Sequence, residues 1–234
     1  MLILSIFGLI LNLLVIYILL IRIRILKIDT ILSNLITVLD IASALSLITR
    51  IIWKWSTAGN DDLYNNEIFC KASGTIFFAS TLSSFDIVSV LGLIRCLIIV
   101  FKLKFKSIYW SALLALILCF NWLGAIFLNW NFSEISWGNF CKYQEDLDNG
   151  GGAFGPIISI KAVIMVIIVC LSYTLIFRFY GIYYDKMKRS SSQSDCNLLH
   201  EIKTQKSITS LKLLGLIFSY IIIYLPKIII FILY

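Results

Sequence analysis

Long apolar stretches, each able to cross a lipid bilayer as a helix, are the feature that most constrains this chain. The hydrocarbon core of a bilayer is about 30 Å thick and an α-helix rises about 1.5 Å per residue, so one crossing needs roughly 20 apolar residues. Strands of a membrane barrel would alternate with period two, and these stretches do not. We predict a single all-α domain over residues 1–234, a polytopic membrane helix bundle. Its six expected spans are Met1 to Ile21, Ile31 to Ile52, Gly74 to Phe101, Ile108 to Trp130, Pro156 to Tyr180 and Ser207 to Tyr234.

The composition excludes an ordinary soluble globular domain. Hydrophobic residues make up 60% of the chain and charged residues 14%, and the mean hydropathy is +0.94. Met1 leads straight into the first apolar stretch without a charged start or a small-residue cleavage site. We therefore expect this segment to be a retained span and not a signal peptide.

Basic residues gather in alternate links, and this pattern sets the expected orientation. The links after the first, third and fifth spans are strongly basic, whereas the other links carry three lysines among seven acidic residues. By the positive-inside rule the basic links are cytoplasmic, so the N-terminus is extracellular in a multi-pass protein of the plasma membrane. The net charge of +7 is then a topology signal that favours contact with lipid headgroups, not nucleic acid. The basic residues are Arg22, Arg24, Lys27, Lys102, Lys104, Lys106, Lys186, Lys188, Arg189, Lys203 and Lys206.

The cysteines fit the same orientation. Cys70 precedes the third span and Cys141 lies between the fourth and fifth, so both face the oxidising side and are the natural disulfide pair. The other four cysteines lack metal-binding or redox spacing, and we expect free thiols there. Asn131 begins an N-glycosylation sequon on the same outer side.

Polar residues inside the expected spans point to functional positions, because each is costly in lipid. Asn12 and Asp40 occupy the first two spans. At 100° per residue, Cys70, Phe77, Ser84 and Arg95 fall close to one line along the third span, which we expect to face inward. Asp86 points to nearly the opposite side, where we expect it to bond a neighbouring helix.

These residues together resemble the rhodopsin-like (class A) G-protein-coupled receptors. The resemblance covers essentially the whole chain and rests on the order, spacing and sidedness of several short motifs. The matching positions are Asn12-Leu13-Leu14-Val15, Leu39-Asp40, Cys70 followed 25 residues later by Arg95, Trp122, Cys141, Tyr173 and Tyr224-Leu225-Pro226.

The resemblance implies a mechanism and its parts. An extracellular ligand would bias the sixth helix about Pro226 and open a cytoplasmic crevice, lined by Arg95, for a heterotrimeric G protein. Asn12, Asp40 and Ser84 match the family's sodium-binding pocket, so an allosteric sodium ion is the one cofactor we expect. The alternative is that these three groups only hydrogen-bond to one another.

The chain also departs from the family pattern. Ile94-Arg95-Cys96 replaces the acid-Arg-Tyr motif, and a seventh helix is missing after Tyr234, so we expect a partial receptor sequence. Tyr220 and Tyr224 replace the usual phenylalanine and tryptophan, and Met165 replaces a proline. Because Ile94 cannot accept a hydrogen bond from Arg95, we expect a weak resting state and raised basal activity.

A ligand with an acidic group is the hypothesis that the outward-facing cations favour. Arg50, Lys161 and Lys227 lie in the outer halves of their spans, and Lys227 shares a helical side with Tyr224. Phe77 stands where amine receptors carry an aspartate, which disfavours a monoamine. For Arg50 and Lys161 the alternative is that they reach the lipid headgroups.

Two other protein classes are weaker interpretations. A small six-span transporter or channel should show repeats or broken helices, and we find neither. An intramembrane enzyme needs a catalytic set, but the only histidine, His200, lies in a cytoplasmic link and no protease motif occurs. We therefore expect that the chain is not an enzyme.

Overall fold

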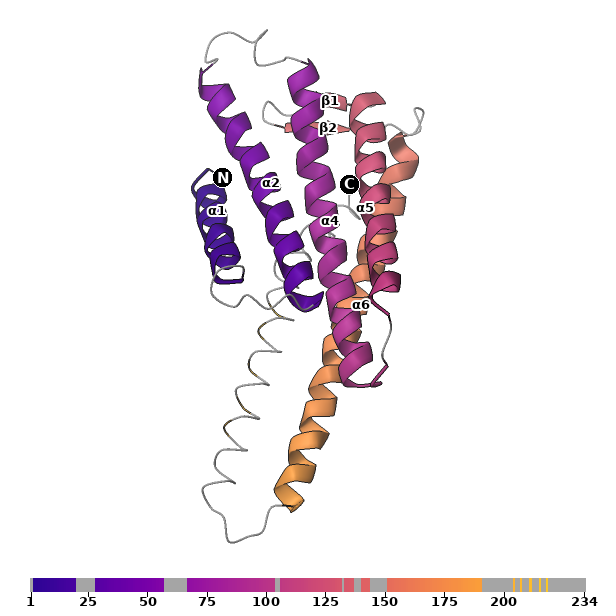
Figure 1. Ribbon diagram of the computed structural model, residues 1–234. Helices are drawn as coiled ribbons and strands as arrows, with labels where there is room; N and C mark the ends of the chain where they lie inside the picture. Colours follow the sequence, from indigo (N-terminus) through magenta and orange to yellow (C-terminus); the bar gives the residue numbers. More distant parts are fainter. Residues whose placement is uncertain are drawn as a thin grey trace. The chain divides into compact units, whose positions relative to one another are not determined.

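The computed structural model of the chain is built from helices, which confirms the predicted all-α class. It describes residues 2–19, 28–56, 67–103, 106–131, 133–136, 140–143 and 151–190, with residues 204, 207, 211, 215 and 218. Five helices and one short hairpin lie within these ranges (Figure 1). The helices are α1 (Leu2–Ile16), α2 (Ile28–Ser56), α4 (Glu67–Ile99), α5 (Ser107–Asn131) and α6 (Gly151–Ser190).

Four of these helices are long and apolar enough to cross a membrane, namely α2, α4, α5 and α6. They correspond to the second to fifth predicted spans. The first predicted span contains a shorter apolar helix over Ser5–Leu19, and the sixth lies outside the described residues apart from isolated positions. The structure therefore supports a multi-span membrane protein, and the predicted number of six spans stays a prediction.

The chain divides into two compact units, which are described separately. The first contains residues 1–88 and 105–155, and the second contains residues 89–104 and 156–234. In the first unit α1 packs against α2, and α4 is bonded to α2 on one side and to α5 on the other. The buried side chains between these helices include Leu32, Leu39, Ala79 and Leu128.

A β-hairpin follows α5 in the first unit. Strands β1 (Ser133–Ser136) and β2 (Phe140–Tyr143) pair antiparallel, with Ile135 opposite Cys141. Both strands contact α5, and Figure 1 draws them beside the first turns of α4. The hairpin therefore brings the backbone of Cys141 to the end of the unit at which Cys70 lies.

The second unit contains the C-terminal part of α4 and nearly all of α6. Lys102 adopts a left-handed conformation with φ of 54°, and the N–H of Leu103 donates to the carbonyl of Leu97 at 3.1 Å, which ends α4. Helix α6 continues ten residues past the predicted Tyr180. Ring contacts one turn apart, Phe179 with Tyr183 and Tyr180 with Tyr184, line this extension.

Large apolar side chains remain exposed along the spans. On α5 they include Leu116 and Leu123, with exposed fractions of 69% and 66%. An apolar surface of this kind is costly in water but is the expected lipid-facing side of a membrane helix. In contrast, 61% of the most apolar window of α4 is buried, so α4 carries much of the interior.

Candidate functional site

The interior of α4 is unusually polar for a membrane helix. Seven of its hydroxyl or carboxyl side chains are buried, and in lipid each needs a hydrogen-bonding partner. Serine and threonine satisfy part of this need within the helix, as in the bond from Thr75 Oγ1 to the carbonyl of Lys71 at 2.7 Å. The buried polar residues are Ser73, Thr75, Ser80, Ser83, Ser84, Asp86 and Ser89.

Asp40 on α2 and Ser84 on α4 meet inside the first unit. Ser84 Oγ donates to Asp40 Oδ1 at 2.7 Å, and Ser84 is only 2% exposed while Asp40 is half-buried. The two residues are 44 positions apart in the chain and were matched to one pocket by the family resemblance. Their carboxylate and hydroxyl oxygens are hard donors of the kind that sodium prefers, so they fit the predicted ion.

Asn12, the third residue of that predicted pocket, is less well supported. It lies half-buried on α1, which packs against α2. Within the part of the chain that the structure describes, no hydrogen bond joins Asn12 to Asp40 or Ser84. Those residues also contain no group of three or more His, Cys, Asp or Glu side chains able to hold a metal ion. The bond from Ser84 to Asp40 is also what the alternative of hydrogen bonding alone expects, so the sodium site stays a prediction.

Asp86 forms a second polar cluster on the other side of α4. Its side chain is 0% exposed, and Asn121 Nδ2 on α5 donates to Asp86 Oδ2 at 2.7 Å. The same Nδ2 lies 3.4 Å from Ser83 Oγ. The expected bond from Asp86 to a neighbouring helix is confirmed. Asn121, itself 2% exposed, was missed by sequence reasoning, although an asparagine inside an apolar span is a signal of this kind.

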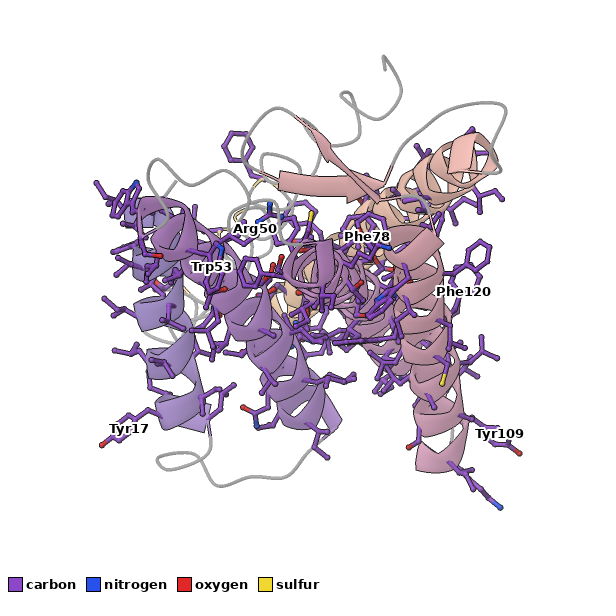
Figure 2. The ribbon with its side chains drawn as sticks, turned by 90° about the horizontal axis from the view of Figure 1, so that it is seen from above. Tyr17, Arg50, Trp53, Phe78, Tyr109 and Phe120 are labelled. Atoms are coloured by element: carbon purple, nitrogen blue, oxygen red, sulfur yellow. The ribbon has the colours of Figure 1, made fainter. Side chains whose placement is uncertain are left out.

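Arg50 belongs to α2 and lies in the part of that helix that faces the start of α4. Only 7% of its side chain is exposed, and Figure 2 shows it turned from α2 toward α4. Ser46 Oγ on α2 donates to the carbonyl of Ser73 at 2.8 Å, and Trp53 stacks on Phe69 with ring centroids 4.8 Å apart. Arg50 thus points into the protein at a well-packed end of the helix pair, which argues against the alternative that it reaches lipid headgroups.

Cys70 lies in the same region and is disulfide-bonded, with 4% of its surface exposed. Its bonding partner lies among the residues whose side chains the structure does not describe. The predicted pairing with Cys141 therefore stays a prediction. Cys96, Cys119 and Cys170 are free thiols, as expected.

In the second unit Arg95 lies against Tyr173. Arg95 Nη1 donates to Tyr173 Oη at 3.4 Å, and Tyr173 is 5% exposed. The ring reaches this position because Gly92 has no side chain. A Cβ on Gly92 would lie 3.3 Å from Tyr173 Cε2, which is tighter than nine in ten real Cβ contacts, so the ring would have to shift by a few tenths of an ångström. Sequence reasoning selected Arg95 and Tyr173 by resemblance but missed Gly92, which only the packing reveals.

The structure describes less about the other predicted site residues. Phe77 on α4 belongs to the first unit and Lys161 on α6 to the second, and both side chains are half-buried. Tyr224 and Lys227 lie outside the described residues. Asn131 is the last residue of α5, and its side chain is not described. The predicted ligand pocket therefore stays a prediction.

Comparison of the sequence with family models and with curated proteins finds no match. The functional interpretation therefore rests on the motifs and on the contacts described above.

Proposed function

We propose that this chain is a rhodopsin-like G-protein-coupled receptor of the plasma membrane with an extracellular N-terminus. The observation that carries the proposal is the order of contacts along α4. Cys70 is disulfide-bonded near its start, Ser84 bonds Asp40 in its middle, and Arg95 bonds Tyr173 near its end. This is the order that the resemblance predicts for the third helix of such a receptor.

The proposed signal begins with an extracellular ligand that carries an acidic group. Arg50 supplies a buried cation at the outer end of α2, beside the Trp53–Phe69 stack. A guanidinium held in a low-dielectric setting binds a carboxylate or phosphate strongly. The other residues proposed to bind this ligand are Phe77, Lys161, Tyr224 and Lys227. A disulfide between Cys70 and Cys141 and a glycan on Asn131 would belong to the same face.

The inner half of the protein would respond through a two-state equilibrium. Proline lacks an amide proton, so Pro226 gives the sixth helix a place to bend. Bending would open a crevice for the G protein beside Arg95. Arg95 is half-buried, and one of its bonded neighbours is the hydroxyl of Tyr173. The proposed raised basal activity rests on Ile94, which stands where the family carries an acid and cannot accept a hydrogen bond from Arg95.

An allosteric sodium ion would be held by Asp40 and Ser84, with Asn12 as the remaining candidate. Bound there, it would supply positive charge that offsets the cost of an ionised carboxylate in the membrane interior. The protein's part is to keep the Asp40 carboxylate oriented, through the short bond from Ser84.

Basal nucleotide exchange on a G protein tests the proposal without a known ligand. Membranes containing the full chain should activate a co-expressed G protein above empty membranes, and Arg95→Ala should remove the excess at equal surface expression. Lys71→Ala is the matched control, because it removes one positive charge at the opposite end of the same helix. Equal activity of all three membranes would contradict the receptor. Substrate uptake into vesicles would instead favour the six-span transporter.

A further inference from the structure

Ser80 is a buried hydroxyl that the protein does not satisfy. It lies on α4 with 0% exposure, and its Oγ has no hydrogen-bond partner among the described residues. Most buried hydroxyls in native proteins are hydrogen-bonded, because a buried hydroxyl without a partner has lost its hydrogen bonds to water and gained none in return. Neighbouring hydroxyls on the same helix do find partners, for example Ser73 and Thr75. Ser80 is therefore a position at which a small ligand would be bound.

The surroundings of Ser80 define what that ligand can be. Ser83 and Ser84 lie three and four residues further along the helix, which places their Cβ atoms about 5–6 Å from that of Ser80. Direct bonds between these hydroxyls are not made, but one atom between them can reach all three. Ser83 and Ser84 are 0% and 2% exposed, so the ligand is enclosed and small.

The three hydroxyls offer complementary hydrogen-bonding groups. Ser84 uses its proton to bond Asp40, so its remaining capacity is as an acceptor. Ser83 faces the Asn121 amide with its oxygen, which leaves its own proton to donate. Ser80 can do either. A water molecule has two donors and two acceptors, and buried waters typically make about three bonds.

We propose that a water molecule is bound by Ser80, Ser83 and Ser84 and links the two carboxylates of the first unit. On one side Ser84 leads to Asp40 on α2, and on the other Ser83 leads through Asn121 to Asp86. The polar chain then runs from α2 through α4 to α5. A change in the charge of Asp40 is felt at Asp86, and the reverse. This inference does not depend on the receptor proposal.

Removing the hydroxyl of Ser80 tests the bound water. If the water is present, Ser80→Ala loses its bonds, and the melting temperature of the purified full chain falls by about 2–4 °C. If Ser80 is merely unsatisfied, deleting its hydroxyl leaves the melting temperature unchanged or raises it. That second result would overturn the proposal. The proposal would also be overturned if Ser80→Ala lowered the melting temperature in sodium chloride but not in choline chloride, because the bound ligand would then be a sodium ion.

The proposed link is tested by a double-mutant cycle. Asp40→Asn and Asp86→Asn should shift the melting temperature non-additively in the natural chain and additively when Ser80 is alanine. Ser73→Ala is the matched control, since its hydroxyl bonds the carbonyl of Cys70 within the helix and should leave the non-additivity intact. Additive shifts in every background would refute the link. An experimental density map gives a test that needs no variant: a water peak within hydrogen-bonding distance of Ser80 Oγ is expected, and a direct bond from Ser80 to a backbone carbonyl would overturn the proposal.

Discussion

The role of a single residue in this protein depends on the side chains that pack against it. The ring of Tyr173 lies close to the position that a side chain on Gly92 would occupy, and the hydroxyl of the same tyrosine accepts a bond from Arg95. Asp86 has zero exposure, and an amide on another helix, that of Asn121, donates a hydrogen bond to it. Neither relation is visible in the local sequence, since the partners are 81 and 35 residues away.

The close approach at Gly92 predicts opposite outcomes for two glycine substitutions. Adding a methyl group to a helical glycine normally stabilises by about 0.5–1 kcal/mol. Gly124 on α5 has open space around it, so Gly124→Ala should show this gain. At Gly92 the new Cβ meets the ring of Tyr173, and overpacking of about 1–3 kcal/mol should cancel or exceed it. Thermal unfolding in detergent measures the change in stability of each variant. Equal gains for Gly92→Ala and Gly124→Ala would contradict the prediction and show that the ring of Tyr173 moves aside without cost.

At the scale of elements, α4 organises the first unit through polar bonds to both neighbours. Its bonds with α2 include Ser43 with Thr81 and Asp40 with Ser84, and its bonds with α5 include Asp86 with Asn121. In a membrane the apolar surface gives little preference for one helix partner over another, so buried polar pairs and close packing select the neighbours.

Two of the bonds between α2 and α4, Ser84 with Asp40 and Ser43 with Thr81, should differ in strength. Ser84→Ala removes a donor from a carboxylate, with an expected loss of about 1.5–3 kcal/mol if Asp40 is ionised. Ser43→Ala removes a bond between two neutral hydroxyls, for which about 0.5–1.5 kcal/mol is expected. The free energy of unfolding of the two variants measures the difference. Equal losses would indicate that Asp40 is protonated.

Two asparagines on α5 allow the bond to α4 to be isolated. Asn121 and Asn129 are both 2% exposed, but Asn129 donates to the carbonyl of Ala125 in its own helix. Asn121→Ala leaves the buried Asp86 with one bond fewer and should cost about 2–3 kcal/mol, against about 1 kcal/mol for Asn129→Ala. Unfolding of the two variants in the same detergent compares them. A smaller loss at Asn121 would mean that the bond to Asp86 does not hold α5.

For the whole molecule, the length of apolar stretches predicts the helices well. The fourth predicted span, Ile108 to Trp130, differs from α5 by one residue at each end. The predicted helix ends are less accurate where a helix extends beyond its apolar stretch. Helix α4 begins seven residues before the predicted Gly74. Helix α6 continues to Ser190, and aromatic contacts lie along this extension. The β1–β2 hairpin was not predicted, because four-residue strands in a link carry little periodic signal.

The candidate site was predictable to a different degree. Asp40 and Ser84 were matched through resemblance to a family and are brought together in the structure. Trp53 and Gly92 were missed because their importance arises from tertiary partners and not from a motif. Asn121 was missed although an asparagine inside an apolar span is itself a signal. Tyr224 and Lys227 stay predictions, since they lie outside the described residues.

The receptor proposal makes one prediction about basal nucleotide exchange that depends on Ile94. This side chain is 0% exposed and directly precedes Arg95. Ile94→Asp would supply the acidic partner that the family pattern contains, and basal nucleotide exchange should fall several-fold. Ile94→Asn controls for burial of a polar group of the same size without charge. At matched surface expression, an equal fall in both variants would count against an ionic restraint on Arg95.

The orientation of the chain in the membrane is what the receptor proposal depends on most directly. Short epitopes placed at the N-terminus, within residues 144–150 and within residues 191–203 can be stained on intact and on permeabilised cells. We predict that the first two are reached on intact cells and the third only after permeabilisation. Staining of the third on intact cells, with the first two hidden, would contradict the receptor.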